Sequence, residues 1–275
     1  MTAESAIAGR GRWGARDAGR RVGDVVPPIV AFVVLLSVWE ITVRALNLKQ
    51  FVLPSPVAIG TAFVDNFATL RAAATYTLVE VVSGLLLGAT AGVLVGGAAA
   101  RFAALRGSLL PFAIAANSVP IIAFAPIFNN WFGVDNQLSK TMIAAVLVFF
   151  PVMVNTIRGL VNVDPSALEL LRSYAASETK VFRSLRLPNS VPFVFTALRV
   201  GATLATIGAI VAEYFASPRG SLGQYIATQS AFLAFDRSWA AIIFAAAIGI
   251  GLYLLVVALE RIVSPWASAR PVPEE

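Results

Sequence analysis

The side chains that can do chemistry in this chain are few, and they lie in strongly apolar surroundings. Two carboxylates, Glu80 and Glu213, fall within long apolar stretches, and three amides lie near the prolines of another: Asn117, Asn129 and Asn130. An ionisable group in a bilayer costs about 2.5–3.5 kcal/mol on insertion scales, so such groups face protein or water. The carboxylates are therefore either paired within the protein or at an interface, or they line a solute pathway. The amides either bind backbone groups freed by the prolines or hydrogen-bond a heterocycle.

Histidine and cysteine are absent from all 275 residues. Their absence removes the commonest general base near neutral pH, thiol catalysis and the usual transition-metal ligands. The chain also lacks a GxxxxGK[ST] phosphate loop. We therefore expect no catalytic residue, no metal site and no cofactor in this chain.

The composition is that of a membrane protein. Hydrophobic residues make up 58% of the chain and charged residues 13%, against about 25% charged in soluble domains, and the mean hydropathy is +0.79. We predict an all-α, polytopic membrane protein, because several uncharged stretches are long enough to cross a bilayer as helices. Its six predicted spans are about Pro28–Leu46, Ala74–Ala99, Leu109–Phe132, Thr141–Leu160, Phe193–Phe215 and Ser238–Leu259.

Two of these spans have unusual features. The third contains Pro111, Pro120 and Pro126, so we expect it to be kinked or broken. The second contains glycines at every fourth position: Gly84, Gly88, Gly92 and Gly96. Such a stripe lets another helix approach closely. It indicates packing within the chain, a seam between two subunits, or a surface that slides between alternating states, and the sequence leaves all three open.

Lysine and arginine in the loops predict the orientation. They gather in residues 1–24, in the loop after the second span and in the long loop after the fourth. The opposite side has fewer: Lys49, Arg71, Lys140, Arg219 and Arg237. We therefore place both termini in the cytoplasm, with residues 1–24 and 264–275 as short disordered ends around a membrane domain at 25–263. Cations at loop ends suit lipid headgroups, so we expect no nucleic-acid partner.

The long cytoplasmic loop predicts a pair of short helices. Asp164 can cap a first helix that opens at Pro165, and Ser177 can cap a second over Glu178–Arg186, which Leu187-Pro188 would end. The chain is expected to break around Tyr174–Ala176. A solvated amphipathic loop is the simplest reading. A helix pair displayed for a cytoplasmic partner is the functional one.

This loop resembles the EAA loop of permease subunits from binding-protein-dependent ABC importers. That pattern runs Glu-Ala-Ala, three residues, Gly, and later Leu-Pro. Here Glu169 takes the Glu position, Ala175 the Gly position, and Leu187-Pro188 the Leu-Pro. Leu170 and Leu171 replace the two alanines. Ala175 also departs from the pattern, because Gly would allow a left-handed turn that Ala resists.

The resemblance implies a function for the loop and a set of partners. Two ATPase subunits, which bind MgATP, would dock on a coupling helix formed by Glu169, Arg172, Ser173, Tyr174, Ala175, Ala176, Ser177, Leu187 and Pro188. A second permease subunit would complete the pathway, and an extracytoplasmic binding protein would deliver the solute. The chain would then be a non-catalytic subunit in the bacterial plasma (inner) membrane. Glu80, Asn117, Asn129, Asn130 and Glu213 are the residues that we expect to line the pathway.

The resemblance extends over about residues 28–262 and includes VPIIAFAPIFNNWFG at 119–133. It is strongest to the nitrate, sulfonate and taurine group, and within it to permeases for thiamine-precursor pyrimidines or riboflavin. The solute is accordingly expected to be such a heterocycle, with sulfonate, taurine or nitrate as alternatives. An ion-coupled secondary transporter is the rival class, and it predicts an internal repeat and a relay of carboxylates. We find no clear repeat and two candidate acids.

Overall fold

The computed structural model describes residues 11–117, 119–215 and 220–266, and every regular element in them is a helix. In chain order these elements are α2 (Gly11–Ala45), α3 (Pro56–Asp65), α4 (Phe67–Arg101), α5 (Ala103–Asn117), the 3₁₀ turn η1 (Ile121–Phe124), α6 (Ala125–Phe132), α7 (Gln137–Val161), α8 (Pro165–Ser173), α9 (Glu178–Val181), the π-helical turn η2 (Phe182–Arg186), α10 (Leu187–Phe215), α11 (Leu222–Ala231) and α12 (Phe235–Val263). The all-α prediction is confirmed.

Within the described residues, five helical segments are long and apolar enough to cross a membrane: Val26–Ala45, Phe67–Arg101, Gln137–Val161, Glu178–Phe215 and Phe235–Val263. They contain five of the six predicted spans. The third predicted span, Leu109–Phe132, is instead divided between α5, η1 and α6. Pro120 and Pro126 explain the break, because each removes a backbone donor and crowds the preceding turn.

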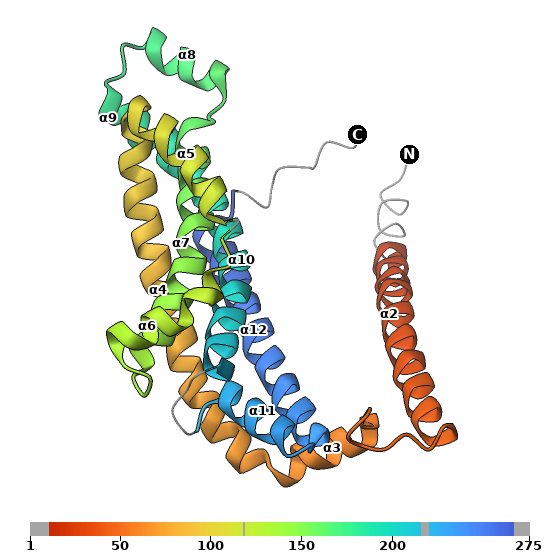
Figure 1. The fold of residues 1–275 in the computed structure, drawn as a ribbon. Helices are drawn as coiled ribbons and strands as arrows, with labels where there is room; N and C mark the ends of the chain where they lie inside the picture. The colour runs from red at the N-terminus through yellow and green to blue at the C-terminus, as the bar shows by residue number, and fades with distance from the viewer. Residues whose placement is uncertain (1–10, 118, 216–219, 267–275) are drawn as a thin grey trace, which may run out of the picture.

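Helices α4, α7 and α10 form the centre of the bundle, and α12 packs on α10 (Figure 1). The core between them consists of small and β-branched side chains, among them Val81, Ala144, Val148 and Ala205, all fully buried. Such side chains let helices approach closely in a membrane.

The glycine stripe of α4 lies against α7. A Cβ atom on Gly84 would come within 2.5 Å of the Ala144 Cβ, and one on Gly92 within 2.9 Å of the Phe149 carbonyl oxygen. Gly88 and Gly96 meet α7 in the same way. The stripe is thus a packing seam within the chain, and it holds α4 against α7 from Gly84 to Gly96.

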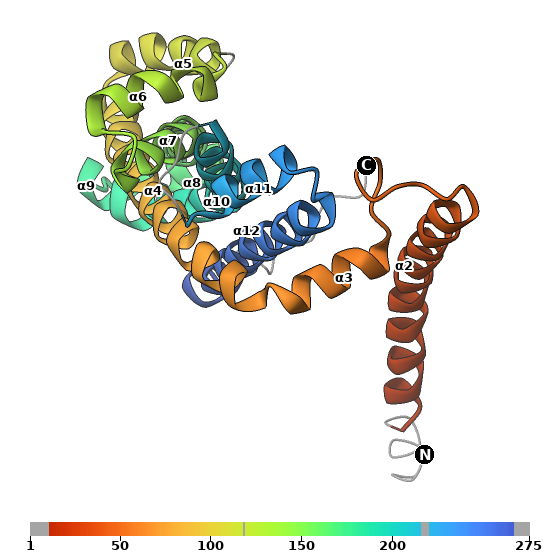
Figure 2. The same ribbon diagram turned by 60° about the horizontal axis from the view of Figure 1, so that its bottom comes forward.

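Helix α2 stands apart from the bundle and is joined to it near its C-terminal end (Figures 1 and 2). There Trp39 packs edge to face on Trp239 of α12, with ring centroids 5.4 Å apart. The Glu40 carboxylate accepts a hydrogen bond of 3.1 Å from the Val57 N–H at the start of α3. The remainder of the apolar span, Val26–Ala45, is almost entirely exposed.

The predicted disordered ends differ in part from the structure. Helix α2 begins at Gly11, so residues 11–24 of the basic segment are helical. Four arginines in this stretch favour helix, and the helix forms although four glycines there disfavour it. Residues 1–10 and 267–275 lie outside the described part.

Candidate functional site

The loop after α7 forms a helical tip that projects beyond the bundle (Figure 1). Asp164 caps α8, because its Oδ1 accepts a 2.9 Å hydrogen bond from the Ser166 N–H, and Pro165 occupies the first turn. No residue of α8 is buried. At its end the Tyr174 side chain is 78% exposed. Since the chain itself leaves this surface uncovered, it is available to a partner.

The turn after α8 brings Ala175 into the left-handed region, at φ 52°. The Ala175 N–H bonds the Arg172 carbonyl at 2.9 Å, and the Ala176 N–H bonds the Leu171 carbonyl at 3.0 Å. This is the hydrogen-bond pattern in which glycine commonly ends a helix. The position that the EAA pattern gives to glycine therefore keeps its left-handed turn here, although alanine occupies it.

Ser177 then caps α9, its hydroxyl accepting from the Lys180 N–H at 3.3 Å. The predicted helix end at Leu187-Pro188 is wrong. The chain passes through η2, where the Leu187 N–H bonds the Phe182 carbonyl, and continues without interruption into α10. Pro188 directly follows this π-helical turn, where the backbone hydrogen bonds already depart from the regular α-helical pattern.

The base of the tip is anchored on the end of α7. Arg186 donates to the Leu160 carbonyl at 3.1 Å, and Asn189 donates to the carbonyls of Gly159 at 2.8 Å and Asn162 at 3.0 Å. These bonds satisfy carbonyl groups that a helix end leaves open. They tie the start of α10 to the end of α7, so the tip rests on two spans.

The predicted docking residues divide between these two places. Those gathered at the tip are Glu169, Arg172, Ser173, Tyr174, Ala175, Ala176 and Ser177, all exposed except Ala176, which is half-buried. Leu187 and Pro188 lie at the base, at the junction of η2 and α10. The structure thus brings together the tip residues and separates the Leu-Pro pair from them.

A second polar cluster is buried at the other end of α7. Glu213, 1% exposed, accepts a 2.8 Å hydrogen bond from the Thr77 hydroxyl at Oε1 and another of 2.8 Å from the Gly223 N–H at Oε2. The Thr77 oxygen in turn accepts from the Leu222 N–H at 3.0 Å. These bonds hold the first turn of α11 against α4 and α10.

Lys140 organises the α7 side of this cluster. Its side chain is fully buried, although the distribution of lysine and arginine between the loops had placed it on the outer surface. Its Nζ donates to the Asn129 Oδ1 at 3.2 Å and to the Val134 carbonyl. The Ser139 hydroxyl also donates to Asn129, at 2.5 Å. Lys140 lies in the first turn of α7, and its bonds to Asn129 of α6 and to the Val134 carbonyl keep its side chain inside the protein.

The family model described as "binding-protein-dependent transport system inner membrane component" matches residues 84–268. This match covers more than half of the chain. The chain belongs to this family. It is the membrane-spanning, non-catalytic permease subunit of an ABC importer for small solutes, and a multi-pass protein of the inner membrane.

Named relatives of the permease cover nearly its whole length. The chain is 30% identical over 252 residues to a formylaminopyrimidine transport permease protein of Halalkalibacterium halodurans, which covers 90% of this chain and 98% of the relative. It is 28% identical over 242 residues to a riboflavin transport system permease protein of Chloroflexus aurantiacus, covering 87% and 90%. A taurine transport system permease protein of Escherichia coli is 29% identical over 252 residues, covering 88% and 90%.

Within the permease, the predicted pathway residues have different surroundings. Glu80, Glu213 and Asn129 are buried inside one subunit. Asn130 is exposed on α6, beside Trp131, whose side chain is 67% exposed. The side chain of Asn117, and Ser118 entirely, lie outside the described residues. Lining of the pathway by these residues stays a prediction.

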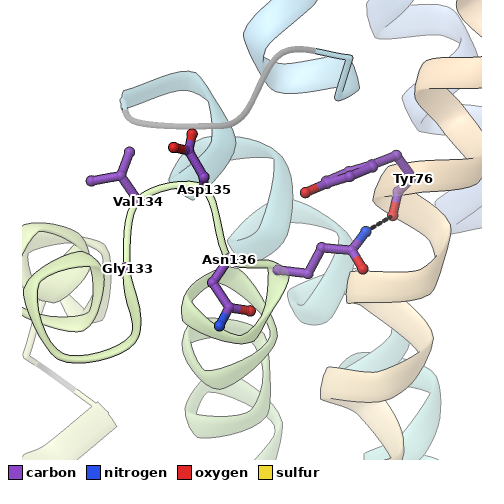
Figure 3. Close-up of a pocket in the computed structure, with 6 residues that line it drawn as sticks. Tyr76, Gly133, Val134, Asp135 and Asn136 are labelled. Carbon is purple, nitrogen blue, oxygen red and sulfur yellow. Dashed lines mark hydrogen bonds between the residues drawn. The ribbon is translucent and has the colours of Figure 1, made fainter.

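A pocket of about 650 Å³ opens next to the buried cluster (Figure 3). It lies between Tyr76 of α4 and the loop that joins α6 to α7, residues 133–136, and Gln137 closes one side by donating to the Tyr76 carbonyl at 3.4 Å. The Val134 carbonyl in this loop is the one that Lys140 binds. Nothing in the sequence pointed to Tyr76, Thr77 or Lys140. The partners of Tyr76 and Thr77 lie 61 and 136 residues away, and Lys140 binds Asn129 and Val134 only because the chain turns back between α6 and α7.

Proposed function

We propose that this permease works with a second permease subunit, two ATPase subunits and an extracytoplasmic binding protein, and that its tip is the coupling helix. The exposure of Tyr174 and of the rest of α8 carries this proposal. Each ATPase would hold one tip in a surface groove. The N-terminal end of α2 and the C-terminal end of α12 lie on the same side of the bundle as the tip (Figure 1). This arrangement supports a cytoplasmic position for both termini.

The anchored base suggests how ATP binding would move the spans. Arg186 and Asn189 join the tip to the last carbonyls of α7, and α10 continues from η2 without a break. Closure of the two ATPases would therefore displace α7 and α10 together. In this mechanism the displacement opens the pathway to the outside, where the binding protein releases its solute.

We propose a pyrimidine thiamine precursor or a riboflavin-like heterocycle as the solute. The 30% identity to the formylaminopyrimidine permease supports this class. So does the occupation of two cations: Lys140 is bound by Asn129, and Arg199 by the Glu260 carboxylate of α12. Lys140 is fully buried and the Arg199 guanidinium is paired with a carboxylate, which makes both poor sites for an anion such as a sulfonate or nitrate. Asn130 and Trp131 on α6 offer an amide and an aromatic face, which suit a planar heterocycle.

Uptake in cells tests both halves of this proposal. The permease would be expressed with its ATPase and binding protein in a host without such uptake systems, and labelled formylaminopyrimidine, riboflavin, taurine and nitrate would be supplied separately. Heterocycle uptake that ends when the ATPase cannot hydrolyse ATP is the expected result. Uptake of taurine or nitrate alone would overturn the solute class. Uptake that does not need the ATPase would overturn the mechanism.

A further inference from the structure

Glu80 differs from Thr77, Lys140 and Glu213 of the buried cluster in having no hydrogen-bond partner within the described part of the chain. Its side chain is fully buried, and neither carboxyl oxygen meets an N–H or O–H donor among the described residues. Glu213, by contrast, receives one donor on each oxygen. A buried carboxylate without a donor is strongly unfavourable, whereas a protonated carboxyl needs one acceptor.

The groups around Glu80 come from several elements. From α10, Glu213 lies near Glu80, because Thr77, three residues earlier on the same face of α4, donates to the Glu213 Oε1 at 2.8 Å. From α7, Lys140 lies near it, because Gly84 of α4 packs against the neighbouring Thr141. Helix α4 itself adds Tyr76, one turn earlier, and α11 adds the Gly223 N–H that binds Glu213. Asp135, in the exposed loop, adds a negative charge close enough to act on Lys140 and Tyr76.

The charges of this cluster decide its protonation. Lys140 carries one positive charge and binds the uncharged Asn129 and Val134. If both carboxyl groups were ionised, two negative charges would lie side by side, and neither would have an ion-pair contact with the lysine. One proton shared by the two carboxyl groups leaves one negative charge opposite one positive charge, which is the least costly state in a membrane interior.

We propose that Glu80 and Glu213 form a buried proton-binding site, in which Glu80 carries the proton and donates it to Glu213. An alkali cation is a poorer occupant, because the two Glu213 oxygens already accept hydrogen bonds and leave Glu80 as the free ligand. The site strengthens the attachment of α11, since Glu213 is then held in place to receive the Gly223 N–H. This site belongs to the folded subunit, whichever solute the permease carries.

The composition of the chain makes this site measurable. With no histidine and no cysteine, few other groups titrate between about pH 5.5 and 8.5. The folded site keeps a proton that Glu80 releases on unfolding, so stability must fall as the pH rises through this range. One retained proton corresponds to about a tenfold rise in the unfolding equilibrium constant per pH unit.

The experiment compares unfolding of the purified, detergent-solubilised permease with that of Glu80→Gln across this pH range. Glutamine keeps a donor for Glu213 and has no proton to lose, so the variant is expected to fold and to lose the pH slope. Asp65→Asn, which changes an exposed carboxylate, is the control and should keep the wild-type slope. Equal slopes in wild type and Glu80→Gln would overturn the proposal.

Two further measurements keep the test decisive. Repeating the series in sodium and in choline salts at equal ionic strength is expected to change nothing, and stabilisation by sodium alone would show a cation site instead. Infrared spectra of the wild-type permease at pH 7.5 should contain the C=O stretch of a protonated carboxylic acid. Its absence would overturn the proposal even if Glu80→Gln failed to fold.

Discussion

The two ends of α7 treat polar side chains in opposite ways. At one end the tip exposes Tyr174 and the polar side chains of α8, and its hydrogen bonds are caps between residues a few positions apart. At the other end Thr77, Lys140 and Glu213 are buried and bind partners from other helices. The tip is therefore a surface built for a partner outside the chain, whereas the cluster holds the subunit itself together.

The largest expected difference between the ends is the side of the membrane on which they lie. The chain has no cysteine, so Ser173→Cys at the tip and Asp135→Cys in the outer loop give two clean labelling sites, both exposed. A membrane-impermeant maleimide should label Asp135→Cys in intact cells and Ser173→Cys in inverted vesicles. The reverse pattern would place the termini outside and contradict the proposed orientation.

Loss of a buried acceptor should be costly, and loss of an exposed one should not. Glu213→Leu leaves the Gly223 N–H without its partner, and we expect a loss of about 3 kcal/mol of unfolding free energy. The matched change Glu169→Leu at the tip should alter stability by no more than about 0.5 kcal/mol. Denaturation in detergent measures both. Similar losses at the two sites would remove the distinction drawn between the ends.

A change at the tip should weaken binding of the ATPase and leave the stability of the subunit unchanged, which is the reverse of the effect expected at the buried cluster. Tyr174→Asp places a charge where a partner would cover an exposed ring, and we expect affinity to fall by roughly thirtyfold, or about 2 kcal/mol. The stability of the isolated subunit should not change. Co-purification with the ATPase in MgATP measures the loss, and Tyr174→Phe should retain binding. An ATPase that binds Tyr174→Asp normally would exclude the tip as its docking site.

The smallest expected effect concerns the turn at Ala175. Its φ of 52° suits glycine, so Ala175→Gly should stabilise the subunit by about 0.5–1 kcal/mol. Ala176 lacks a positive φ, so Ala176→Gly should destabilise it slightly by adding freedom to the unfolded chain. Denaturation curves of the two variants measure this. Destabilisation by Ala175→Gly would show that the alanine side chain makes a contact that outweighs the backbone strain.

The tip could be predicted from the sequence because its determinants are local. Asp164 and Ser177 cap the helices that follow them, as predicted. The predicted break around Tyr174–Ala176 contains the left-handed turn at Ala175, although alanine was expected to resist that conformation. Sequence spacing did not predict the continuation of η2 into α10, because the packing of Arg186 and Asn189 on α7 fixes that path.

The contacts of the buried cluster could not be predicted from the sequence, because they join residues far apart in the chain. Thr77 and Glu213 are separated by 136 residues, and their meeting depends on how α4, α10 and α11 pack. Lys140 was counted among the exposed loop cations. Nothing nearby in the chain indicates that its side chain would be buried between the start of α7 and the loop that follows α6. The partner of the glycine stripe was open for the same reason, because close approach predicts a neighbouring helix without identifying it.

The glycine seam has a consequence for how force would pass through the subunit. With backbone against backbone from Gly84 to Gly96, α4 and α7 have little room to slide along each other. They should respond to a load as a single stiff beam. One end of that beam bears the tip, and the other bears the loop held by Lys140, so a displacement applied in the cytoplasm is expected to arrive at the opposite face nearly undiminished.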